Sequence, residues 1–209
     1  MKHWLLFFLL FRALPLAAQD GQGGDLPPRQ PVPPAVMVEA QEATQKLVDQ
    51  VVAGDFLAPI EAMHPEWKKK EAMKSGGMEK YLAKINAEIE KLKAMGMKVL
   101  VMKADPPVQG FEVDFGVVEG QGAFRKWMVF VPTRKIFSAF QPDVQPPKMV
   151  KIGTNSFMVA IREKSGGEWS FIDGSALRAL DLRQMFPFLP KADQRLGFPP
   201  RNGRVMEEN

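Results

Sequence analysis

Four side chains in this sequence could take part in proton transfer, and the first lies in the stretch GGEWSFIDGS. Asp173 stands there directly before Gly174. Aspartate followed by glycine favours a tight turn, because glycine accepts a positive φ and aspartate bonds the backbone that follows it. Acid-base catalysis needs a second group within hydrogen-bond reach, and the spacing offers only Glu168 nearby. We expect Asp173 to form a turn, with proton transfer as the alternative.

The other three candidates are Asp114, His64 and Tyr81. Asp114 lies in an alternating segment whose odd positions are apolar, so we expect its side chain on the solvated face. His64 titrates near neutral pH and could act as a general base, but its place before Pro65 favours a structural role in a loop. Tyr81 is the only tyrosine. It could offer its hydroxyl to a pocket or lie partly buried with its oxygen at the surface.

The motifs do not indicate a metal or a cofactor. The chain has no cysteine and only two histidines, which leaves too few ligands for a zinc site of recognisable spacing. No phosphate loop, dinucleotide fingerprint or serine nucleophile elbow occurs. The net charge of +4 comes without a clustered basic face, and the run of lysines at 68–70 is expected to be a solvated helix face. We therefore predict no cofactor, no metal and no nucleic-acid partner.

The N-terminus predicts export to the periplasm or the medium. Residues 1–18 comprise a short positive start, an apolar run from Trp4 to Phe11 and small residues before Gln19, a pattern typical of a cleaved signal peptide. The run is shorter than the roughly 20 residues that span a membrane, so no stable span is expected after cleavage. An uncleaved anchor is the alternative. Residues 19–35 are rich in proline and glycine and are expected to form a disordered linker.

The rest of the chain predicts a single α+β domain at residues 36–190 and a polar tail at residues 191–209. Helical spacing is expected in three segments, which end near Gly54, Met63 and Gly96. The last of these, expected to be the longest helix, follows the glycine pair at 76–77. Its apolar face comprises Met78, Leu82, Ile85, Ile89 and Leu92.

From Val99 onwards the apolar period changes to that of strands. We expect an antiparallel, curved sheet of about four to six strands, with the N-terminal helices packed on it. Pro132 is expected at an edge or a bulge, and residues 164–167 at a hairpin turn. A short helix after Leu177 should cover one end of the sheet. The expected strands lie near residues 99–105, 111–117, 124–137, 152–162 and 169–172.

The run HPEWKKKEAMKSGGMEKYLAKINAEIEKLKAMGMKV, followed by EWSFIDGS and MFPFLP, resembles a group of exported bacterial domains of unknown function. These look like the cone-shaped nuclear transport factor 2-like or ketosteroid isomerase-like (cystatin-like) fold. The resemblance covers about residues 38–190 and implies long helices over one face of a curved sheet, with space for a ligand between them. Enzymes of that fold hold an acidic base and a hydroxyl donor in an apolar pocket, and no such motif can be matched here residue by residue.

These observations give one principal hypothesis and two alternatives. We expect an exported, non-catalytic domain that binds a small apolar ligand or another envelope protein. The first alternative is a cofactor-free acid-base enzyme, an isomerase or dehydratase, that uses Asp173, Asp114 or His64 with Tyr81. The second alternative is a structural homodimer.

Overall fold

The computed structural model describes residues 28–118, 121–141, 148–190 and 196–206. Within these residues five helices accompany a six-stranded antiparallel sheet that is curved and unclosed, which confirms the α+β prediction. The predicted signal peptide at residues 1–18 lies outside the described residues. So does the first part of the predicted linker.

Four of the five helices in the described residues lie near their expected positions, and the other occupies residues 65–74, where the sequence indicated a loop or a bent helix. The helices are α1 (Pro34–Val52), α2 (Ala58–Glu61), α3 (Pro65–Lys74), α4 (Met78–Ala94) and α5 (Ala179–Met185). The strands are β1 (Lys98–Ala104), β2 (Gln109–Val118), β3 (Gln121–Gln141), β4 (Lys148–Glu163), β5 (Ser170–Asp173) and β6 (Asn202–Met206). α1, with 19 residues, is longer than α4, with 17, so the prediction that α4 is the longest helix was wrong.

Two long strands form the centre of the sheet. β3 pairs with β4 along its whole shared length, and the shorter strands pair with successive halves of these two. β2 and then β1 lie along the outer edge of β3, while β5 and then β6 lie along the outer edge of β4. Six strands therefore make a sheet that is four strands wide.

Pro132 corrects one expectation, because it lies inside the central strand β3. The pairing of β2 with β3 ends at Phe130, and the pairing of β1 with β3 begins at Thr133. Pro132 falls between the segments that pair with β2 and with β1. No residue of either strand is paired with it there, so the N–H that proline lacks is not needed for a hydrogen bond. Its carbonyl accepts a hydrogen bond from the backbone N–H of Asp105 at 2.8 Å.

Apolar side chains form one cluster on each face of the sheet. Along β3, Met128 and Phe130 point to one cluster, while Val129 and Val131 point to the other. Trp67 of α3 and residues of α5 pack in the first cluster, and α1 and α2 pack in the second. Helices therefore cover both faces of the sheet, whereas the resemblance implied helices over one face.

The domain extends further toward both ends of the chain than predicted. Residues 28–33, assigned to the linker, lie against the sheet, where the backbone N–H of Gln30 donates to the carboxylate of Glu112 at 2.7 Å. Glu112 shares the even positions of the alternating segment with Asp114, which predicts the solvated face, but it is buried there and pairs with Lys164. In the predicted tail, Leu196 is buried in the first cluster and β6 pairs with β4. The tail joins the domain because β5 is short and leaves half of the β4 edge free.

Candidate functional site

His64 is the most enclosed of the four candidates and lies directly before α3. Its backbone N–H donates to the carbonyl of Phe171 at 2.8 Å, and its own carbonyl accepts from Lys68 at 2.9 Å. The imidazole is buried, its ring meets Phe186 edge-on at 5.6 Å between centroids, and Nδ1 lacks a hydrogen-bond partner within the described chain. Burial, followed by the charge of Lys126, lowers the pKa of His64 to about 4. The ring is therefore neutral at pH 7.

A polar pocket of about 330 Å³ opens beside His64. Its cations are already paired: Lys126 contacts Glu163 at 3.4 Å, and Arg162 contacts Glu39 at 2.6 Å. A histidine with a pKa near 4 is a weak base at neutral pH, and no carboxylate of the described residues is hydrogen-bonded to this ring to orient it. The remaining lining residues are Pro65, Glu66, Ile161, Glu168 and Ser170.

Asp114 interrupts the pairing of β2 near this pocket. The residue has a φ of 62°, and the pairs Val113–Lys126 and Phe115–Phe124 on either side of it keep the same register. Its carboxylate contacts Lys126 at 2.9 Å and Arg125 at 3.0 Å. Partial burial is the largest single effect and favours the neutral acid, but the hydrogen bonds and charges of the two cations together lower the pKa of Asp114. Asp114 is thus an ionised, half-buried member of an ion-pair network.

Tyr81 and Asp173 lie elsewhere. The ring of Tyr81 is buried and its hydroxyl donates to Sδ of Met63 at 3.8 Å. Burial, followed by the charge of Glu71, raises the pKa of Tyr81. Asp173 accepts a hydrogen bond from the backbone N–H of Ser175 at 2.7 Å, as an aspartate in a turn does. Neither residue lines the His64 pocket.

Only two of the four sequence candidates therefore come together. His64 and Asp114 meet around Lys126, which sequence reasoning missed because a single lysine in an alternating strand has no motif of its own. Tyr81 and Asp173 lie outside this group of His64, Asp114 and Lys126. The arrangement holds one neutral imidazole among charges that are already paired with one another, and it does not form an acid-base pair.

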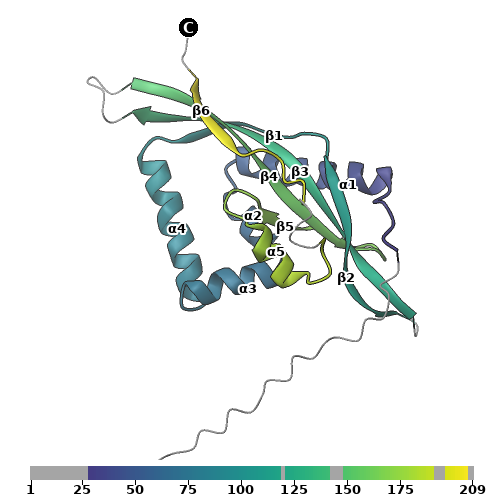
Figure 1. Cartoon of the computed structure of the whole chain (residues 1–209). Coiled ribbons are helices and arrows are strands. Elements are labelled where there is room, and N and C mark those ends of the chain that lie inside the picture. The colour runs from purple at the N-terminus through teal and green to yellow at the C-terminus, as the bar shows by residue number, and fades with distance from the viewer. Residues whose placement is uncertain (1–27, 119–120, 142–147, 191–195, 207–209) are drawn as a thin grey trace, which may run out of the picture.

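The second candidate site is a surface formed by α3 and α4, which we call the arm. Figure 1 shows α4 at the side of the molecule, apart from the sheet, and in the part of the chain that the structure describes it packs closely only on α3. The apolar face predicted for α4, which we call the seam, belongs to neither core cluster. The side chains of Met78 and Leu82 are 40% and 37% exposed. The seam comprises Met78, Leu82, Ile85, Ile89 and Leu92.

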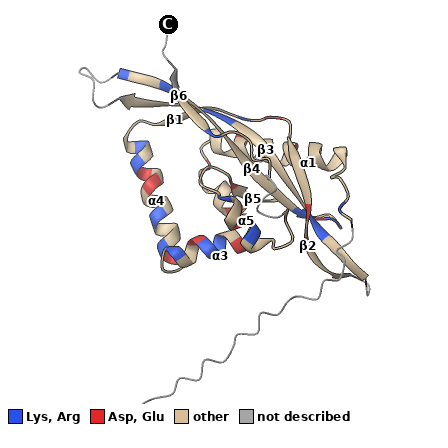
Figure 2. Ribbon diagram, in the orientation of Figure 1, with Lys and Arg blue, Asp and Glu red and all other residues tan. Residues whose placement is uncertain are grey.

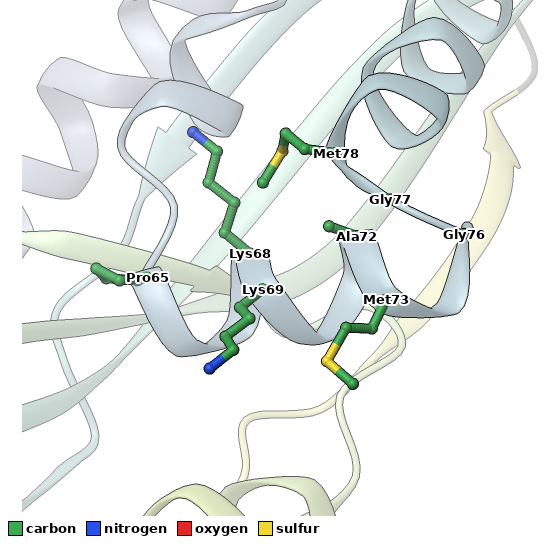
Figure 3. Close-up of a pocket in the computed structure, with 8 residues that line it drawn as sticks. All are labelled: Pro65, Lys68, Lys69, Ala72, Met73, Gly76, Gly77 and Met78. Atoms are coloured by element: carbon green, nitrogen blue, oxygen red, sulfur yellow. The ribbon is translucent and has the colours of Figure 1, made fainter.

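The seam continues into a pocket of about 600 Å³ at the bend between α3 and α4 (Figure 3). Gly76 and Gly77 form this bend, with φ of 80° and 122° that favour glycine. Met73 is 72% exposed and lines the pocket together with Met78. In Figure 3 the side chain of Lys68 projects beside that of Met78. Figure 2 shows charges of both signs along α3 and α4, so the arm combines an apolar seam with a mixed-charge remainder.

Comparison with known proteins found no matching family model, no matching curated protein and no matching solved structure. The resemblance to the nuclear transport factor 2-like fold therefore stays a prediction. None of the helices in the described residues is both long enough and apolar enough to cross a membrane.

Proposed function

We propose that this chain is an exported, non-catalytic protein-interaction domain whose contact surface is the seam of α4. The observation that carries the proposal is an apolar stripe that joins neither core cluster, with Met78 and Leu82 exposed and the other three side chains only half-buried. A helix in a protein owes most of its stability to the packing of its apolar face. Burial of each large apolar side chain contributes about 1.5–3 kcal/mol. A partner that covers the seam would supply this packing.

The shape of the seam favours a protein partner over a small ligand. The five side chains extend over 15 residues of one helix, a length of about 21 Å at 1.5 Å per residue. Small-molecule sites are concave and enclose most of the ligand. A long stripe on a convex helix is instead suited to another helix, which can lie along it.

The acid-base alternative has less support. It needs two groups that share a pocket and can exchange a proton with a substrate. His64 is neutral, the neighbouring carboxylate of Asp114 contacts Lys126 and Arg125, and the hydroxyl of Tyr81 lies against Met63. No two candidates are hydrogen-bonded in the geometry that proton transfer requires.

Site-specific photo-cross-linking in the native cells tests the proposal. A photoreactive residue placed at Leu82 lies on the seam, whereas one placed at Ala87 is exposed on the opposite side of the same helix. We expect a covalent adduct with a protein from the Leu82 position and none from the Ala87 position. Equal yields from the two positions, or no adduct from either, would contradict the proposal.

A further inference from the structure

The seam residues follow one another at intervals of four, three, four and three, which is the a/d spacing of a coiled coil. Met78, Ile85 and Leu92 occupy d positions, while Leu82 and Ile89 occupy a positions. A helix with this repeat packs its a/d stripe against a second helix. In the described residues no other helix lies along α4.

We propose that the seam pairs with the α4 helix of a second copy of this chain, antiparallel about a two-fold axis. This inference rests on the proposed function and names its partner. The seam is symmetric about residue 87, so an antiparallel copy places each a position opposite a d position. Leu82 then meets Leu92 of the second copy, and Ile85 meets Ile89 of the second copy. A two-fold axis repeats both contacts, which gives four apolar layers.

The residues at the ends of the seam fit the same register. Met78 falls opposite the segment that directly follows the C-terminus of α4 in the second copy. Beyond that point lie further exposed apolar residues at the adjoining ends of β3 and β4, where Phe140 is 51% exposed and packs against Gly96 of its own chain. The antiparallel arrangement brings the bend of one copy, with Met73, to these strand ends of the other. These end contacts enlarge an interface that a short helix pair alone would leave below the usual 1,200–2,000 Å² of a stable complex.

Charges beside the seam also complement one another. Glu79 has no ion pair among the described residues, and the antiparallel register places it next to Lys93 of the second copy, twice over. Within the described part of the chain, Lys93 pairs with exposed Glu90 of its own helix, at 2.8 Å. One like-charge contact remains, because Glu88 lies close to Glu88 of the second copy at the two-fold axis.

Single-cysteine variants test the register, because the chain contains no cysteine. Full-length copies with Ile85→Cys and copies with Ile89→Cys would be expressed together with distinguishable tags and purified. The mixed disulfide should form about tenfold faster than the disulfide of either variant alone, since only the mixed pair lies face to face. Ala87→Cys, on the opposite side of α4, is the control. If the mixed disulfide forms no faster than that of the Ala87→Cys control, the pairing of the two α4 helices is overturned. If the disulfide of one variant alone forms faster than the mixed one, the antiparallel direction is overturned.

Glu88→Gln provides a second measurement of direction, by sedimentation equilibrium. In the antiparallel dimer the substitution removes a like-charge contact and should lower the dissociation constant roughly twofold. In a parallel dimer Glu88 would lie beside Lys93 of the second copy, and the same substitution would raise the dissociation constant. The photo-cross-linking experiment separates this inference from the proposed function. An adduct of Leu82 with a different protein keeps the proposed function and overturns the dimer, whereas no adduct at all overturns both.

Discussion

Burial, more than any neighbouring charge, determines what His64 can do. His64 lies at the junction of α3 and β5. Its backbone N–H bonds to Phe171 of β5 and its carbonyl to Lys68 of α3, so the residue joins the two elements. The sequence indicated a loop, because proline after histidine often marks one. Proline is equally suited to the first position of a helix, which is where Pro65 lies. The His64–Pro65 pair thus indicated that the chain changes direction here. Only the tertiary packing shows that the imidazole ring of His64 is enclosed.

The lowered pKa of His64 predicts a pH-dependent stability. With a pKa of about 4 in the folded chain and about 6.5 in the unfolded chain, the unfolded chain binds more protons between these values. The free energy of unfolding should therefore be highest above pH 6.5 and fall by up to about 3 kcal/mol as the pH decreases to 4. Urea unfolding over this range, compared with His64→Gln, measures the effect. An unchanged slope in the variant would show that another group is responsible.

At the scale of elements, periodicity predicted the helices well and the packing less well. The spacing from Met78 to Leu92 indicates a helix wherever its apolar face is buried, so it predicts α4 without indicating what α4 packs on. The polar segment Asn202–Met206 has no strand pattern, and it pairs because the β4 edge beyond β5 is free. Local sequence cannot indicate such an edge, since it arises from the lengths of distant strands.

An ion pair between two helices gives the prediction at this scale. Lys70 of α3 contacts buried Asp181 of α5 at 2.6 Å, and the Arg178 and Lys70 hydrogen bonds hold the pKa of Asp181 well below its usual range. Asp181→Asn leaves both cations without their counter-charge and should lower the free energy of unfolding by about 2–3 kcal/mol at pH 7.

Glu71→Gln is the matched control for this pair. It breaks an exposed pair with Lys74 on the same helix, which should cost below about 1 kcal/mol. Urea unfolding of both variants makes the comparison. Similar losses in the two variants would show that the Asp181 pair does not join α3 to α5.

At the scale of the whole molecule, the arm and the start of the described chain lie on opposite sides. Residues 28–33 pack beside the β2–β3 hairpin, and Figure 1 shows α4 at the other side of the sheet. The residues that precede position 28 therefore join the domain far from the seam. In the account proposed here, the linker connects to one end of the domain, while the arm at the other end is left accessible to a second copy.

Hydrogen exchange of the α4 amides tests this account most directly. The comparison is between the wild-type chain and a double variant, Leu82→Glu with Ile89→Glu. Glutamate forms helices as well as or better than the residues replaced, so a bare helix would exchange equally or more slowly in the variant. A seam covered by a second copy predicts the opposite. The α4 amides should exchange at least about tenfold faster in the variant, while α1 is unchanged and Ala87→Glu has no effect. Equal or slower exchange of α4 in the double variant would contradict the account.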